Sequence, residues 1–477
     1  MQNNKKIVDN FFWRFLERIS AQGITFIVSV VLARLLDPEI YGTVALVTAI
    51  ITILNVLVDS GLGVSLIQKK DADDIDFSTV FWFNLTLCFV FYMLMFFGAN
   101  LISEFYKIPE LTNIVRVLSL CLIVAGIKNV QQAYVSRHLI FKKFFWATFG
   151  GTVMSAFVGI GMALQGFGVW ALVFQNLTNQ FFDTLILWLT VKWRPKFVFS
   201  VERFKKLFSF GYKLLLTSII DTTYNQLRQL VLGKNYSSSD LAYYNQGYKY
   251  PSLIVVNIDT SIDSVLLPAL SNEQDDLQRV KAMTRRAIKV STYLLMPCLA
   301  GLAACAESII TIMLTEKWLP CVPYLRIFCL AYALYPINTA NLNAIKAIGR
   351  SDISLKLEII KKTIGFLSII FAMNISPIAL AYSLLFSSIC AQFINAWPNK
   401  KLLGYSLVEQ MKDIMPQTIL SLIMLSCILC VGVLQINLWV RLGLQISVGI
   451  GIYIIGSIIL KIDSFIYILN VLKNYKK

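Results

Sequence analysis

The sequence has almost no histidine and little charge. His138 is the only histidine among 477 residues, and Asp, Glu, Lys and Arg together make up 15% of the chain. A single imidazole leaves almost no material for histidine metal sites, general bases or nucleophile triads. We therefore expect no catalytic residue, no metal site and no cofactor, and ordinary hydrolase chemistry is disfavoured.

Motifs for other common chemistries are also missing. The nine cysteines lie mainly inside apolar segments, where they act as small apolar residues rather than as a disulfide framework. No Gly-Lys-Ser/Thr phosphate loop is present, so direct ATP hydrolysis is unsupported. Asp71, Asp73, Asp74 and Asp76 cluster together, but the glycine and glutamate of a calcium loop are absent at their required positions. We expect a solvated loop there.

Long apolar segments dominate what is present. The chain is 57% hydrophobic with a mean hydropathy of +0.67, far above a soluble domain. A bilayer core takes about 20 apolar residues per helix, so the sequence predicts an all-α, polytopic membrane protein of about 14 transmembrane helices. The predicted spans are 11–35, 41–66, 77–104, 112–136, 144–166, 168–191, 205–232, 240–268, 284–314, 320–346, 354–373, 376–397, 413–435 and 438–460.

The basic residues alternate between loops. The two terminal segments and every second loop between the predicted spans hold 27 Lys and Arg residues. The alternate loops hold only Lys107, Lys234, Lys317 and Arg441. The positive-inside rule then places both termini in the cytoplasm. The net charge of +16 is mostly this topology signal, and its scatter over many loops argues against nucleic-acid binding. No cleavable signal peptide is expected, because the first apolar segment carries Arg14 and Arg18.

A weak internal repeat predicts two related lobes. Residues 31–41 are echoed by 231–242, and 58–60 by 262–264. Six spans separate the copies, so the repeat is parallel. We predict an N-lobe of helices 1–6 at 1–192, a basic cytoplasmic linker at 193–206, a C-lobe of helices 7–12 at 207–400, and two further helices with an amphipathic, interfacial tail at 401–477.

Polar residues inside the spans are the best candidates for a site, because charge is costly at membrane depth and normally faces protein or water. They recur every three or four residues on helices that are equivalent in the two halves, and they predict a cation-lined cavity between the lobes. Cations suit a diphosphate, and neutral groups suit sugars. The candidates for substrate binding are Arg14, Arg18, Gln22, Asn55, Lys128, Lys213, Asn225, Arg228 and Lys249; those for ion coupling are Asp59, Asp221, Asp259 and Asp263.

Structural roles compete with these assignments. Arg14 and Arg18 are also placed to snorkel to cytoplasmic headgroups. Lys128, Lys213 and Lys249 are equally able to pair with carboxylates as structural ion pairs. The residues alone do not choose between these roles.

Several longer motifs carry a resemblance to a known family. They are LARLLDPE at 32–39, VDSGLGVSLIQKKDA at 58–72, GFGVWALVFQ at 166–175, EKWLP at 316–320 and AIGRSD at 347–352. With these motifs the chain resembles bacterial Wzx-type polysaccharide flippases, in particular the colanic-acid exporter-like branch. This family belongs to the larger superfamily of multidrug, oligosaccharidyl-lipid and polysaccharide exporters, which includes the lipid II flippase.

The resemblance implies a two-lobed transporter of the bacterial inner membrane, not an enzyme. It would move an undecaprenyl-diphosphate-linked oligosaccharide to the outer leaflet by alternating access, for surface polysaccharide biosynthesis. Membrane lipids and a polysaccharide polymerase with its chain-length regulator are the implied partners. Two alternatives stay open: a cation-coupled multidrug exporter, for which a carboxylate-rich cavity is expected, and a membrane glycosyltransferase, polymerase or ligase, for which a large outer loop is expected.

Overall fold

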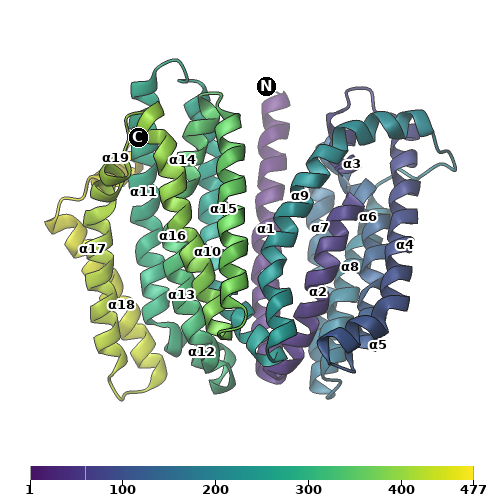
Figure 1. Cartoon of the computed structure of the whole chain (residues 1–477), viewed down its shortest axis with the longest axis horizontal. Coiled ribbons are helices and arrows are strands. Elements are labelled where there is room, and N and C mark those ends of the chain that lie inside the picture. Colours follow the sequence, from purple (N-terminus) through teal and green to yellow (C-terminus); the bar gives the residue numbers. More distant parts are fainter. Residues whose placement is uncertain (1, 60, 476–477) are drawn as a thin grey trace. The chain divides into compact units, whose positions relative to one another are not determined.

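The computed structural model describes residues 2–59 and 61–475. The side chains of residues 2–12, 14, 15, 18, 472, 474 and 475 lie outside this description. Within it, the regular secondary structure is helical throughout (Figure 1). The chain divides into two compact units, Met1–Ala242 and Tyr243–Lys477.

The first unit contains the helices up to the start of α10. They are α1 (Gln2–Leu35), α2 (Pro38–Asp59), α3 (Leu62–Gln68), α4 (Asp74–Tyr106), α5 (Leu111–Leu118), α6 (Leu120–Arg137), α7 (Phe141–Leu164), α8 (Val169–Thr190) and α9 (Val201–Asn235). Helix α8 packs on α7 and α6, and α9 packs on α2, α3 and α4. Aromatic and aliphatic side chains of α3, α4, α6 and α7 form a buried core with Trp193.

The second unit contains most of α10 and the helices after it. They are α10 (Ser238–Ser271), α11 (Leu277–Ala304), α12 (Ala306–Leu314), η1 (Glu316–Cys321), α13 (Val322–Ala333), α14 (Tyr335–Ala347), α15 (Ser351–Ala372), α16 (Pro377–Leu402), α17 (Leu407–Gly432), α18 (Leu438–Ile459) and α19 (Asp463–Tyr475). Helix α11 packs against α13, α14 and α17, and α18 packs on α17. The amphipathic tail is helical, as predicted, and packs on α11.

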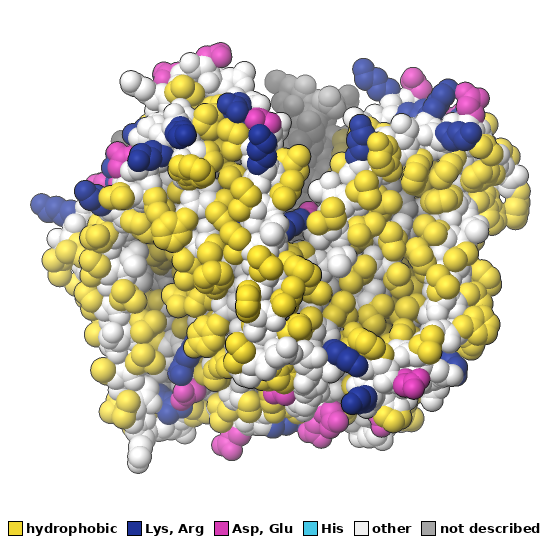
Figure 2. All heavy atoms as spheres, in the orientation of Figure 1, with side chains coloured by type: hydrophobic (Ala, Val, Ile, Leu, Met, Phe, Trp, Pro, Cys, Tyr) yellow, Lys and Arg dark blue, Asp and Glu magenta, His cyan; other side chains and the backbone are white. Residues whose placement is uncertain are grey.

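The predicted spans correspond to the observed helices. The pairs α2–α3, α5–α6, α11–α12 and α13–α14 each match one predicted span, and the remaining long helices match one span each. Ten helices of the described chain are long and apolar enough to cross a membrane. Helices α8, α9 and α15 are not among these ten, and the described apolar part of α1, Ile19–Leu35, is a shorter apolar helix. The all-α, polytopic fold is thus confirmed, and each unit shows an apolar middle between charged ends (Figure 2).

Four of the predicted spans are broken into two helices. The break after α2 lies beside Gly61, which has a left-handed φ of 63°. A Cβ atom at Gly61 would lie 2.4 Å from the carbonyl oxygen of Gly211 in α9. Only glycine allows both this backbone conformation and this approach. The break therefore lets α3 pack directly on α9.

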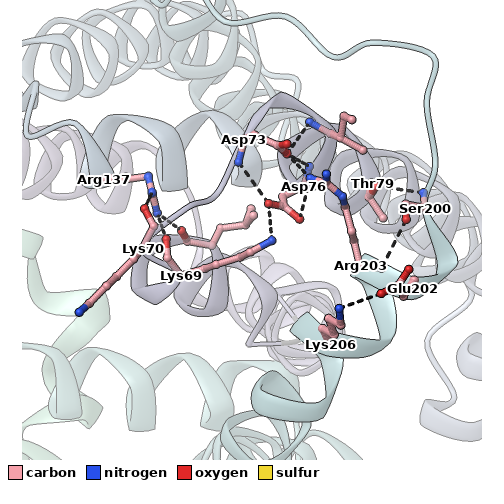
Figure 3. A network of polar contacts seen from close by, with 12 residues as sticks. Lys69, Lys70, Asp73, Asp76, Thr79, Arg137, Ser200, Glu202, Arg203 and Lys206 are labelled. Atoms are coloured by element: carbon pink, nitrogen blue, oxygen red, sulfur yellow. Dashed lines mark hydrogen bonds and ion pairs between the residues drawn. The ribbon is translucent and has the colours of Figure 1, made fainter.

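The acidic loop before α4 exposes Asp71, Asp73 and Asp74, as the sequence predicts for a solvated loop, but it buries Asp76. Asp73 and Asp76 form a reciprocal capping box at the start of α4. Asp76 is fully buried and its Oδ2 lies 2.6 Å from the Lys69 ammonium. The Arg203 guanidinium donates to Asp73 and lies 3.5 Å from Oδ1 of Asp76 (Figure 3). Buried carboxylates need such partners.

The basic segment before α9 is also tied to the first unit. The backbone N–H of Lys196 donates to Ser78 at 2.9 Å, and that of Ser200 donates to Thr79 at 3.2 Å. The indole N–H of Trp82 donates to the carbonyl oxygen of Lys196 at 2.8 Å. These bonds fix where α9 begins. The lobe boundaries at 192 and 207 stay a prediction, and the division of the chain into two compact units falls between residues 242 and 243.

Candidate functional site

Helix α9 carries the most polar stripe of the first unit. Ser200 caps its first turn, and polar residues then recur every four positions from Lys213 through Asp221 to Asn225. This spacing keeps them near one face of the helix. Lys213 and Asn225 are exposed, and Asp221 is half-buried. A membrane-spanning helix with such a stripe must turn it toward protein or water.

Arg228 follows on the same helix and is buried, with 3% of its surface exposed. Its guanidinium lies 5.4 Å from the centre of the Tyr224 ring and donates to the Tyr224 hydroxyl at 3.5 Å. Arginine stays charged at any relevant pH. The positive charge of Arg228 is therefore held inside the unit, next to an aromatic face that favours it.

The candidates on α1 and α2 are only partly described. The side chains of Arg14 and Arg18 lie outside the described residues. Gln22 and Asp59 are exposed. Asn55 is half-buried, and its Oδ1 has no hydrogen-bond donor in the part of the chain that the structure describes.

Lys128 of α6 has a carboxylate partner. Its ammonium lies 2.5 Å from Oδ2 of Asp183 in α8, and both side chains are largely buried. This is the structural ion pair that competed with a substrate-binding role for this lysine. The pair joins α6 to α8 in the middle of their apolar surroundings.

In the second unit, Lys249 is half-buried on α10. No described carboxylate lies within ion-pair distance of its ammonium, and the same holds for Lys213 in the first unit. Asp263 accepts a hydrogen bond of 2.7 Å from the Asn343 amide of α14. Asp259 is half-buried one turn earlier, beside Thr339. The Asn343 amide thus satisfies Asp263 in part, whereas Oδ1 of Asp259 has no hydrogen-bond donor in the part of the chain that the structure describes.

A cavity of about 340 Å³ opens inside the first unit, between α2, α8 and α9. Its polar lining carries hydroxyl and amide groups but no charge. The lining residues are Tyr41, Val44, Ala45, Thr48, Ala49, Thr52, Leu172, Gln175, Asn176, Gln226 and Gln229.

The sequence alone did not single out this cavity. None of its lining residues is among the site residues that the sequence predicts. A signal was available, since Gln175 and Asn176 interrupt an apolar run in α8, and Gln226 and Gln229 flank the stripe of α9. No group of three or more His, Cys, Asp or Glu residues suited to a metal ion occurs in the described chain.

The sequence matches proteins of polysaccharide biosynthesis. A family model described as a polysaccharide biosynthesis protein matches residues 31–323, more than half of the chain. The succinoglycan biosynthesis transport protein ExoT of Rhizobium meliloti is 24% identical over 74% of this chain and 71% of that protein. The lipopolysaccharide biosynthesis protein WzxC of Escherichia coli is 26% identical over 76% of this chain and 74% of that protein.

Solved structures show the same fold. The lipid II flippase MurJ matches with a TM-score of 0.79 at 15% identity, over 96% of this chain and 99% of that chain. An inward-facing multidrug resistance MATE family transporter matches with a TM-score of 0.60 at 15% identity, over 85% of this chain and 94% of that chain. At such identities the likeness concerns the fold alone, because one fold hosts different functions.

Proposed function

Because this chain belongs to the polysaccharide biosynthesis protein family, whose model matches residues 31–323, we propose that it is a lipid-linked oligosaccharide flippase. It carries an undecaprenyl-diphosphate-linked oligosaccharide from the cytoplasmic to the outer leaflet. The oligosaccharide then enters O-antigen, capsule or exopolysaccharide assembly. Relatives named for succinoglycan transport and for lipopolysaccharide biosynthesis support this role.

The observation that carries the proposal is the state of two lysines. Lys213 and Lys249 lie in long helices of the predicted spans, and no described carboxylate pairs with either ammonium. An uncompensated cation at membrane depth is costly and marks a functional site. A diphosphate supplies the missing negative charge through charge-assisted hydrogen bonds. Arg14, Arg18 and the buried Arg228 belong to the same proposed set of cations.

Neutral groups then meet the sugars. Gln22, Asn55 and Asn225 offer amide donors and acceptors on α1, α2 and α9. Asp59, Asp221, Asp259 and Asp263 are the candidates for coupling to an ion. In the proposed cycle the lobes rock about the bound headgroup, while the lipid tail stays in the bilayer. Lys128 contributes less directly, because Asp183 already neutralises it.

The protein works in the bacterial inner membrane with both termini in the cytoplasm. Its partners are membrane lipids, the lipid-linked oligosaccharide, and a polysaccharide polymerase with its chain-length regulator. A cation-coupled multidrug exporter is the alternative within the same fold. The two unpaired lysines disfavour that alternative, because a cationic drug requires carboxylates facing it.

The test is flipping in proteoliposomes. The purified protein is reconstituted, and the movement of a fluorescent undecaprenyl-diphosphate oligosaccharide between leaflets is measured. We expect Lys213→Gln and Lys249→Gln each to slow flipping about tenfold or more, because each removes a charge-assisted hydrogen bond. Lys346→Gln, at an exposed position near the end of α14, is the matched control and leaves the rate unchanged.

Each other outcome has a distinct meaning. Unchanged flipping in both variants contradicts the lysine site but not the flippase. If the wild-type protein fails to flip several glycans under several ion gradients, the flippase itself is contradicted. The multidrug exporter is then the favoured function. Transport of cationic dyes into the same vesicles tests it.

A further inference from the structure

The uncharged cavity of the first unit differs from the lysine site in its chemistry. It lies between α2, α8 and α9, and none of its lining residues carries a charge. A diphosphate needs cations, so this cavity is not suited to the lipid-linked end of the cargo. Its hydroxyl and amide side chains instead match an uncharged ligand that both donates and accepts hydrogen bonds.

The hydrogen-bonding state of the lining residues supports this match. Thr48 and Thr52 donate to backbone carbonyls at 2.8 Å and 2.7 Å, which leaves their oxygen lone pairs free to accept. The Asn176 amide donates to the carbonyl oxygen of Leu172 at 2.9 Å, which leaves its own oxygen free. These three side chains therefore face the cavity mainly as acceptors.

The glutamines of the cavity supply the donors. Gln175, Gln226 and Gln229 make no side-chain hydrogen bond to any other described residue. Each amide keeps two N–H donors and a carbonyl acceptor. Groups of this kind, left without partners in a half-buried site, need a polar ligand or water.

Apart from Tyr41, the remaining lining residues are apolar. Val44, Ala45 and Ala49 lie on α2, and Leu172 lies on α8. Ligand sites commonly combine such an apolar wall with a few convergent polar groups. A sugar ring has the same two characters, since its hydroxyls are polar and its C–H faces are apolar.

Close helix contacts hold the frame of the cavity in place. A Cβ atom at Gly42, one residue after Tyr41 of the lining, would lie 1.7 Å from the carbonyl oxygen of Ser238. A Cβ atom at Gly233, four residues beyond Gln229, would lie 2.5 Å from Leu46. At Gly42 the backbone of α2 touches the backbone at the start of α10, and at Gly233 the backbone of α9 touches the Leu46 side chain of α2.

The cavity lies toward one end of the unit. It uses the first two-thirds of α2, the first two turns of α8 and the last third of α9. These parts adjoin the loops α1–α2, α7–α8 and α9–α10, which face outward in the proposed topology. Lys213 precedes Gln226 by 13 residues on α9, or about 20 Å along the helix.

We propose that this cavity is a saccharide subsite that binds an uncharged sugar of the oligosaccharide, distant from the diphosphate. The inference rests on the proposed flippase function and adds to it a place where the glycan itself is recognised. Gln175, Asn176, Gln226 and Gln229 are the residues that determine specificity. Two glycans with the same lipid diphosphate are then distinguished by this sugar.

The test measures binding of free saccharides. The purified protein in nanodiscs is screened by saturation-transfer NMR against neutral and acidic mono- to tetrasaccharides that carry neither lipid nor phosphate. We expect the wild-type protein to bind at least one neutral saccharide. Gln175→Leu and Gln226→Leu weaken that binding about tenfold, because each leaves sugar hydroxyls without partners. Gln180→Leu, on α8 outside the cavity, is the matched control.

A second measurement separates this inference from the proposed function. Binding of undecaprenyl diphosphate, which has no sugar, is expected to be unchanged in Gln175→Leu and Gln226→Leu and to fall in Lys213→Gln. If no saccharide binds to the wild-type protein, or if all variants bind alike, the subsite is contradicted. A protein that binds saccharides through these glutamines but flips no lipid contradicts the flippase and leaves the subsite standing.

Discussion

Lysines inside the long helices differ in what lies beside their ammonium groups. Lys128 forms a largely buried ion pair with Asp183, whereas no described carboxylate pairs with Lys213 or Lys249. The charge of Lys128 is therefore neutralised within the fold, whereas we propose that the charges of the other two are available to a ligand.

The first prediction concerns the Lys128–Asp183 pair. Lys128→Met leaves the carboxylate of Asp183 buried without its counter-ion, so we expect the free energy of unfolding to fall by about 3 kcal/mol. The double variant Lys128→Met/Asp183→Leu recovers most of this loss, because no uncompensated charge remains. Denaturant unfolding of the detergent-solubilised protein measures both.

A surface pair gives the control for this experiment. Lys206 and Glu202 lie 2.8 Å apart on α9, and both are exposed. Exposed pairs contribute little, so Lys206→Met leaves the stability unchanged. Equal losses in the single and double variants at Lys128 would show that packing, rather than the ion pair, accounts for the effect.

At the scale of the element, the start of α4 depends on charges that come from α9. The Arg203 guanidinium donates to Asp73 (Figure 3), and this hydrogen bond holds the pKa of Asp73 down at about 2. Asp73 in turn caps α4 through the backbone N–H groups of Ile75 and Asp76. A lowered pKa means that the ionised carboxylate favours the folded arrangement.

The pH dependence follows from that shift. In the unfolded chain the pKa of an Asp carboxyl group is about 3.9. The stabilisation by ionised Asp73 is therefore complete above that pH and is lost as the pH falls toward about 2. We expect amide hydrogen exchange at residues 73–79, corrected for the intrinsic rate, to increase over this window. Arg203→Gln raises the pKa of Asp73 and moves the increase toward pH 4.

Lys206→Gln on the next turn is the matched control, because Lys206 pairs with Glu202 and not with the loop. Its exchange profile follows that of the wild-type protein. An identical profile in Arg203→Gln would show that the capping box alone, without the arginine, holds the first turn of α4.

At the scale of the whole molecule, charge sets the direction of insertion. Loops of one parity hold 27 basic residues and the opposite loops hold four. Lys and Arg remain on the cytoplasmic side during insertion. We therefore expect the two termini to lie on the cytoplasmic side, together with the acidic loop before α4 and the basic segment before α9.

Reporter fusions in Escherichia coli test this topology. Green fluorescent protein fused after Lys477 is expected to fluoresce, because it matures in the cytoplasm. Alkaline phosphatase fused after Lys107 is expected to be active, because it needs the outer side. If the phosphatase is inactive when fused after Lys107 but active when fused after Lys205, the orientation is opposite to the predicted one. The saccharide subsite would then not lie toward the outer side.

The positions and the order of the helices could be predicted from local sequence. Predicted spans such as 376–397 and 438–460 agree closely with α16 (Pro377–Leu402) and α18 (Leu438–Ile459). The reason is physical, since the thickness of the hydrocarbon sets the length of an apolar run. The polar stripe of α9 was also legible, because its spacing of four residues is local to one helix.

The contacts between residues of different helices could not be predicted from local sequence. The partner of Lys128 lies 55 positions away, and the cavity joins α2 to amides on α8 and α9. The break at Gly61 depends on the approach of Gly211. Hydropathy reports the environment of each helix averaged over its length, whereas these features depend on the rotation and packing of helices distant in sequence.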